Sequence, residues 1–121
     1  MAIIKPFKAL RPSPDKAKQV SCVPYDVPYD SEVKETIARN PDSFLRITRP
    51  EAEFAEGTHP VRDAVFERAR QNLEQFIRDG ILVQDTEPAV YVYQLSTAAH
   101  TQTGLVACCA IDDYDTGVIK K

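Results

Sequence analysis

The sequence has little glycine, no tryptophan and few cysteines and histidines. Four glycines in 121 residues provide no Gly-rich phosphate loop, and the G-x-S-x-G and H-E-x-x-H motifs of common hydrolases are absent. Cys22, Cys108 and Cys109 lack metal-ligand spacing, and His59 and His100 are isolated, so no metal site is expected. The cysteines are instead predicted to be reduced, buried thiols.

Long apolar runs are also missing. No stretch approaches the roughly 18 apolar residues that span a bilayer, and the N-terminus has no signal-peptide core. We therefore expect a soluble cytoplasmic protein with no membrane partner. Apolar residues make up 43% and charged residues 27% of the chain, which is typical of a globular domain.

Charge is unevenly distributed. The net charge of -3 counts against a surface built to coat nucleic acid, but residues 1–20 contain five basic side chains against one acidic. This segment could contact a phosphate or an acidic partner. The favoured explanation is that these basic side chains form an exposed edge in contact with water, because charge runs are commonly surface features.

The first half of the chain reads as short elements joined by proline-bounded loops. Residues 3–7 have strand character, and a short helix is expected to open at Ser13-Pro14. The repeated Val-Pro-Tyr-Asp of residues 23–30 predicts a rigid loop, because its prolines remove amide donors. A second helix capped by Asp30 or Ser31 follows, and residues 43–48 read as a strand.

The second half predicts one long helix followed by strands. Apolar residues with helical spacing run from 61 to 79, with Phe66, Leu73, Phe76 and Ile77 expected in the core. A strand at 81–83 and a hairpin of 89–95 with 104–111 come next, and both faces of its second strand are expected to be covered. The prediction is a single α+β domain over residues 1–121, with a mostly antiparallel or mixed sheet.

Two carboxylates and two arginines in proline-bounded loops are the first candidate site residues. Asp26 and Glu51 are the candidates for acid or base chemistry, although a turn-capping Asp and an exposed loop Glu remain alternatives. Arg11 and Arg49 could hold a phosphate or carboxylate with a planar fork, or could pair structurally with acidic side chains. We expect Arg11, Asp26 and Arg49 to converge on one cleft.

Three further residues are candidate ligand contacts. Asn40 and Ser43 could donate hydrogen bonds to a ligand, but the Asn-Pro-x-Ser segment also reads as a helix stop followed by a turn. Tyr25 could stack on a ligand, or pack with its hydroxyl bonded.

Five motifs occur in an order that points to one family. They are Ile4-Lys5-Pro6-Phe7-Lys8-Ala9-Leu10-Arg11-Pro12, Pro24-Tyr25-Asp26-Val27, Asn40-Pro41-Asp42-Ser43-Phe44-Leu45 with Arg49-Pro50-Glu51, Tyr91-Val92-Tyr93, and Asp113-Tyr114 before Gly117-Val118-Ile119. Together they resemble the uncharacterised prokaryotic family catalogued as domain of unknown function 1015. The resemblance covers nearly the whole chain.

This resemblance implies a protein about three times longer, of which the chain is a truncated N-terminal portion that stops before a His-Glu-x-Thr motif. Such a portion is expected to be inactive alone. The family is distantly similar to the ParB and sulfiredoxin group. That similarity implies either a serine-type small-molecule kinase using ATP or ADP with Mg²⁺, which is slightly favoured, or a ParB-like chromosome-partitioning or nucleic-acid-binding module.

Two partners are expected on the same basis. The first is the missing C-terminal segment of the same protein, and the second is another copy of the chain. An apolar surface is then expected around Val106, Ile111, Val118 and Ile119, where self-association would occur. Nucleic acid is the less favoured partner because of the net negative charge.

Overall fold

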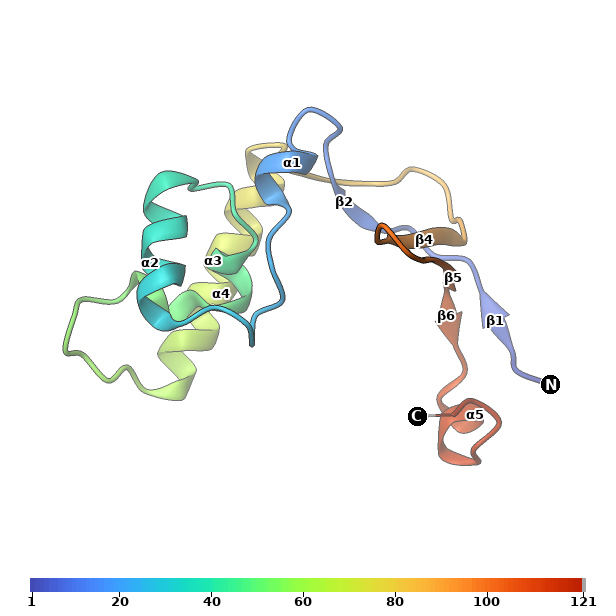
Figure 1. Cartoon of the computed structure of the whole chain (residues 1–121). Helices are drawn as coiled ribbons and strands as arrows, with labels where there is room; N and C mark the ends of the chain where they lie inside the picture. The colour runs from blue at the N-terminus through green and yellow to red at the C-terminus, as the bar shows by residue number, and fades with distance from the viewer. Residues whose placement is uncertain (121) are drawn as a thin grey trace. The chain divides into compact units, whose positions relative to one another are not determined.

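The computed structural model describes residues 1–120, which form an α+β structure divided into two compact units. One unit is Arg11–Val83, and the other combines Met1–Leu10 with the chain from Gln84 onward. Each unit is described by itself (Figure 1). None of the described helices has the length and apolar character needed to cross a membrane.

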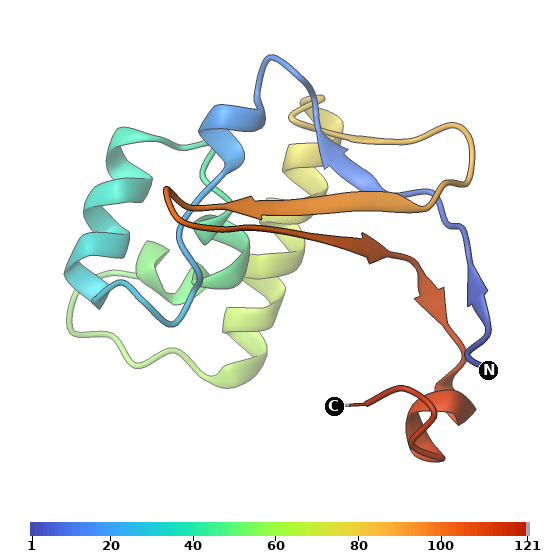
Figure 2. The same cartoon turned by 45° about the vertical axis from the view of Figure 1, so that its right-hand side comes forward.

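The unit Arg11–Val83 is mainly helical. It contains α1 (Ala17–Val20), α2 (Asp30–Arg39), α3 (Leu45–Thr48), the 3-10 helix η1 (Pro50–Glu53) and α4 (Arg62–Arg78). Helices α2, α3 and η1 contact one another, and α3 and η1 also pack against α4 (Figure 2). Strand β2 (Leu10–Pro12) pairs with β3 (Leu82–Gln84).

Helix α4 confirms the predicted long helix to within one residue at each end. It begins after Pro60 and ends before Gly80, whose φ of +68° is a conformation that side chains with a Cβ rarely adopt. The N–H of Gly80 donates to the Ile77 carbonyl at 3.1 Å, and the N–H of Ile81 donates to the Phe76 carbonyl at 2.9 Å. These bonds turn the chain directly from the helix into β3.

The core of this unit lies against the C-terminal half of α4. Val20, Phe76, Ile81 and Leu82 are buried together, with Phe44, Ile47 and Leu73 packed against them. As predicted, Phe76 is in the core and Leu73 packs against it. Phe66 and Ile77 were predicted wrongly, because they remain 57% and 47% exposed. The Phe66 ring is instead covered by the Arg62 guanidinium, 5.2 Å from its centroid.

The predicted strand at residues 43–48 is also wrong, because α3 occupies it. The Ser43 N–H donates to the Asn40 carbonyl at 3.1 Å, and the Ser43 hydroxyl accepts the Leu45 N–H at 3.4 Å, which together start a turn. Helical spacing then directs Phe44 and Ile47 to the cluster around Phe76. Tertiary burial outweighs the strand preference of Phe, Ile and Thr here.

The remaining unit is built from short antiparallel strand pairs. β4 (Tyr91–Ser96) and β5 (Thr101–Val106) form a hairpin in the register Tyr91↔Val106 to Ser96↔Thr101, which confirms the predicted hairpin. β1 (Ile4–Lys5) pairs with β6 (Cys108–Cys109), and Phe7 bridges to Ala89. The chain then enters α5 (Ile111–Asp115), so the second predicted strand is broken into β5 and β6 and stops before Ile111.

Tyr91 anchors the hairpin to the N-terminal segment. Its ring lies 5.1 Å from that of Phe7, its hydroxyl accepts the Ala9 N–H at 2.9 Å, and it donates to Asp85 Oδ2 at 2.6 Å. Beyond this anchor the second strand of the hairpin, β5, is exposed on both faces, contrary to prediction.

All three cysteines are free and exposed, so the expected burial of the thiols was also wrong.

Candidate functional site

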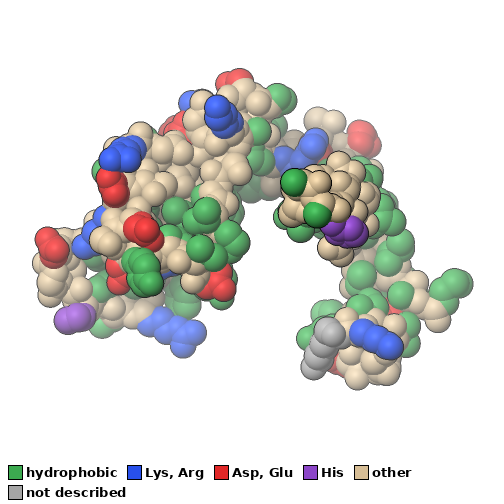
Figure 3. All heavy atoms as spheres, in the orientation of Figure 1, with side chains coloured by type: hydrophobic (Ala, Val, Ile, Leu, Met, Phe, Trp, Pro, Cys, Tyr) green, Lys and Arg blue, Asp and Glu red, His purple; other side chains and the backbone are tan. Residues whose placement is uncertain are grey.

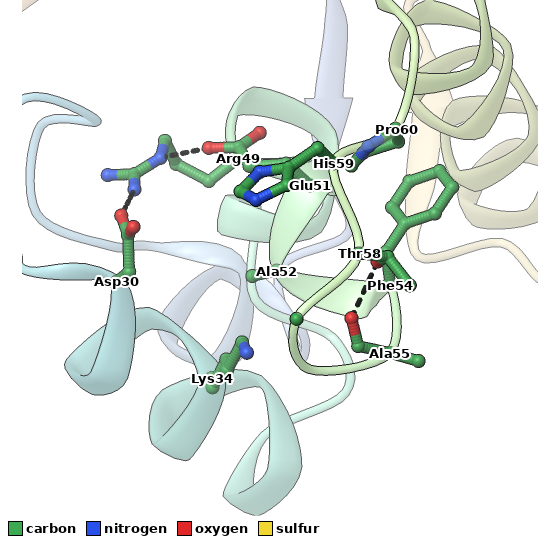
Figure 4. A pocket seen from close by; sticks show the side chains of 11 residues that line it. Asp30, Lys34, Arg49, Glu51, Ala52, Phe54, Ala55, Thr58, His59 and Pro60 are labelled. Carbon is green, nitrogen blue, oxygen red and sulfur yellow. Dashed lines mark hydrogen bonds and ion pairs between the residues drawn. The ribbon is translucent and has the colours of Figure 1, made fainter.

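A cleft of about 290 Å³ opens beside the start of α2, and we call it the α2–η1 cleft. Its charged walls come from Asp30 and Lys34 of α2, Arg49, and Glu51 of η1. The loop from Phe54 to Pro60 closes the other side and brings His59 to the cleft (Figure 4). Gly57, with φ of +76°, allows this loop to turn sharply.

Arg49 is the central structural residue of the cleft. Its guanidinium forms ion pairs with Asp30 and Glu51, drawn as dashed lines in Figure 4. Nη1 also donates to the backbone carbonyls of Tyr25 at 2.8 Å and Pro28 at 3.3 Å. One side chain, only 14% exposed, thus ties the proline-rich loop to the start of α2 and to η1. The hydrogen bond to Glu51, more than any other contact, raises the pKa of Arg49.

The first turn of α2 explains why Asp30 is available to Arg49. The helix N-cap is Tyr29, whose N–H donates to Glu32 Oε2 at 2.8 Å. Asp30 is the first residue of the helix rather than its N-cap, so its carboxylate is not positioned as the capping group. It remains 87% exposed, and one of its two carboxylate oxygens contacts Arg49.

Lys34 and His59 differ from Arg49 in having no side-chain partner among the residues that the structure describes. Among residues 1–120, neither side chain forms a hydrogen bond or an ion pair. Lys34 lies one helical turn after Asp30, so both face the same side of α2. The cleft therefore combines two carboxylates that are anchored by Arg49 with one unpaired ammonium group and one imidazole.

The structure brings together only part of the site predicted from sequence. Arg49 and Glu51 line the α2–η1 cleft, whereas Arg11 on β2 does not. Asp26 and the Tyr25 side chain are exposed on the loop, and only the Tyr25 carbonyl contacts Arg49. Asp26 and Arg11 are thus absent from the lining of the cleft in which Arg49 lies. Their roles in binding or catalysis stay predictions.

Asn40 and Ser43 have structural contacts in a different place. The Asn40 N–H donates to the Thr36 carbonyl at 2.8 Å and ends α2, while its amide donates to the Gln19 carbonyl at 2.6 Å. Ser43 is buried within the turn that starts α3. Both polar groups are occupied by backbone partners, as the helix-stop alternative describes.

A second polar cluster lies between α3, η1 and α4. Arg46 forms an ion pair with Glu53 and donates to Asn72 Oδ1 at 3.1 Å. The Asn72 amide donates to Glu53 Oε2 at 3.0 Å and to the Arg46 carbonyl at 2.7 Å. Because Asn72 is buried and the two charged side chains are 16% and 13% exposed, this cluster joins the helices and leaves little polar surface for a ligand.

Sequence reasoning did not predict that Asp30, Lys34 and His59 line the same cleft. Asp30 was read as a helix cap, and His59 as an isolated residue. The four-residue spacing of Asp30 and Lys34 places them on one helix face, but that spacing usually marks a solvated pair. His59 lies near Asp30 and Lys34 only because the loop 54–60 forms the other side of the cleft.

Replacing Arg49 with lysine is expected to lower the free energy of unfolding by about 1.5–3 kcal/mol, since an ammonium group cannot reproduce the fork that bonds two carboxylates and two carbonyls. Urea denaturation measures the loss. Arg39→Lys is the matched control, because Arg39 forms one exposed pair with Glu35 and should change stability little. Equal losses in the two variants would contradict the anchoring role of Arg49.

Comparison with protein families gives a match over nearly the whole chain. The family model described as "Protein of unknown function (DUF1015)" matches residues 4–121. No curated protein and no solved structure matches the chain.

Proposed function

Since the chain belongs to the DUF1015 family of proteins of unknown function, we propose a function from the chemistry of its cleft: the α2–η1 cleft binds a small zwitterion of the amino-acid class. That ligand is the hydroxyl-bearing acceptor of a nucleotide-dependent, serine-type phosphotransferase. The observation that carries this proposal is the pairing of anchored carboxylates with the unpaired Lys34 in one cleft.

The ligand's ammonium group is placed by the carboxylates. Arg49 contacts one oxygen of Asp30 and one oxygen of Glu51, which leaves the second oxygen of each available. Arg49 fixes both groups and supplies only one positive charge against two negative ones. The remaining negative charge attracts a cation, and a primary ammonium can donate to both free oxygens.

The ligand's carboxylate is placed by Lys34. A lysine with three donors and no partner among residues 1–120 can bind an anionic group, and His59 lines the same cleft. With Lys34 included, the formal charges of Asp30, Lys34, Arg49 and Glu51 sum to zero. A neutral zwitterion therefore suits the cleft better than a simple cation or a polyanion.

The size of the cleft supports a small acceptor. At about 290 Å³ it lies just below the roughly 300–1,000 Å³ range of typical ligand pockets. An amino acid fits this space, but the cleft is too small to hold a nucleotide together with the amino acid. ATP or ADP with Mg²⁺ would bind elsewhere, and Asp26 and Arg11 are candidates for contacts outside the cleft.

Calorimetric titration with L-serine tests the acceptor site. We expect a Kd on the order of 1 mM, which corresponds to about -4 kcal/mol. Lys34→Met should weaken binding at least tenfold. Lys18→Met, which removes another exposed lysine without a partner among residues 1–120, should leave it unchanged. Ethanolamine and propionate, which each lack one charged group of the zwitterion, should bind more weakly than L-serine. Equal affinities of the two lysine variants would contradict the site.

Nucleotide use is tested separately. Protection against thermal unfolding by ATP with Mg²⁺ would support the phosphotransferase. Binding of a DNA duplex that falls steeply with salt, without nucleotide protection, would instead favour the ParB-like nucleic-acid-binding function.

A further inference from the structure

The β4–β5 hairpin carries no charge that would keep other strands away. From Pro88 to Ile111 the sequence contains no Asp, Glu, Lys or Arg, and both strands lie inside this stretch. In the space-filling view the hairpin is tan and green apart from a purple histidine, whereas most blue and red side chains lie over the helical unit (Figure 3). Natural edge strands are usually protected by charge, proline or a bulge, and this hairpin has none of these along β4 or β5.

The unit that contains the hairpin also lacks buried side chains. No residue of 1–10 or of 84–120 is buried. The hairpin itself belongs to a two-stranded sheet, and such a pair is marginally stable in water without a third strand or a covering element. The hairpin therefore gains most from a partner that adds strands.

Both edges of the hairpin present backbone hydrogen-bonding groups. The Thr97 N–H donates to the His100 carbonyl at 2.8 Å, which fixes the alternation of the antiparallel ladder. By that alternation Thr101, Thr103 and Leu105 direct their N–H and C=O groups to the outer edge of β5. These residues are spaced symmetrically about Thr103, so the edge is complementary to itself after a two-fold rotation.

Apolar side chains flank the same edge. Val92 and Leu105 are opposite each other on one face of the hairpin and are 69% and 70% exposed. On the other face Tyr93, Leu95 and Val106 are exposed as well. Pairing along β5 would bring Leu105 of one copy beside Thr101 of the other and bury part of these side chains.

We propose that β5 pairs edge to edge with β5 of a second copy of this chain, antiparallel and centred on Thr103. The result is a four-stranded sheet with a two-fold axis. A second copy is the occupant that fits best, because the edge is self-complementary and has no charge to repel its own copy. This surface lies outside the α2–η1 cleft, so the inference stands or falls independently of the proposed function.

Sedimentation equilibrium of the 121-residue chain from micromolar to millimolar concentration tests the proposal. The wild-type chain should show a reversible monomer–dimer equilibrium. Thr103→Lys places like charges directly opposite each other across the axis and should weaken dimerisation at least tenfold, with partial recovery at high salt. Thr103→Val removes the hydrogen bond to Gln94 in the same way but adds no charge, and it should still dimerise.

A second variant separates loss of pairing from loss of the hairpin. Thr103→Pro removes an outward N–H without removing a hydrogen bond between β4 and β5, and it should abolish dimers. Cross-strand nuclear Overhauser contacts between Val92 and Leu105 report whether the hairpin persists. A strictly monomeric wild-type chain would overturn the proposal. So would dimers of unchanged affinity in both Thr103→Lys and Thr103→Pro.

Discussion

Replacing Phe76 with alanine is expected to lower the free energy of unfolding by about 3–5 kcal/mol. The ring is fully buried and lies at the centre of the cluster formed with Val20, Ile81 and Leu82. The guanidinium of Arg46 also lies 5.7 Å from the ring centroid, so truncation removes packing from α3 as well as from α4. Thermal and urea denaturation measure the effect.

Phe66→Ala is the matched control for this variant. It removes the same ring from the same helix at a position that is 57% exposed, where little apolar area returns to water. We expect a loss below about 1 kcal/mol, close to the range of ordinary surface substitutions. Comparable losses at positions 66 and 76 would contradict the assignment of the core.

Replacing Glu53 with alanine is expected to cost about 3–5 kcal/mol, because it leaves the guanidinium of Arg46 largely buried without its counter-ion. The change also removes the acceptor at 3.0 Å from the Asn72 amide. Chemical denaturation measures the loss. The control is Glu56→Ala in the following loop, since Glu56 is exposed and has no ion-pair partner among residues 1–120.

A double substitution distinguishes a buried charge from lost contacts. Arg46→Met in the Glu53→Ala background removes the uncompensated charge while keeping an apolar stem over Phe76. Most of the lost stability should then return. If the double variant is less stable than Glu53→Ala alone, the burial of an unpaired charge is not the cause of the loss.

The sequence predicted the elements whose local patterns agree with their final packing. Helix α4 has a long apolar stripe and ends at a glycine that needs a positive φ, so both its length and its end could be read from residues 61–80. The hairpin was predictable for the same reason, since two β-rich stretches are separated by a polar turn.

The failures occur where distant contacts decide the local structure. Residues 45–48 are rich in strand formers but form α3, in which Leu45 is buried while Phe44 and Ile47 pack against the core cluster. Phe66 has correct helical spacing, yet nothing in the sequence shows that the packed stripe lies on the C-terminal half of α4. Periodicity gives the face of a helix and leaves open how far along it the core extends.

Only some residues of the candidate site could be predicted from the sequence. Arg49 and Glu51 could be selected because prolines fix the loop around them, and both line the cleft. Lys34 and His59 lack any local motif. Their position in the cleft depends on the ion pair of Asp30 with Arg49 and on the sharp turn of the loop at Gly57, which are properties of the tertiary structure.

An amide chemical-shift titration of the ¹⁵N-labelled chain with L-serine tests most directly whether the α2–η1 cleft binds an amino acid. We expect concentration-dependent shifts confined to the walls of the cleft, including Lys34, Gly57 and His59, and their loss in Lys34→Met. Shifts at other residues, or the same shifts in wild type and Lys34→Met, would contradict binding in the cleft.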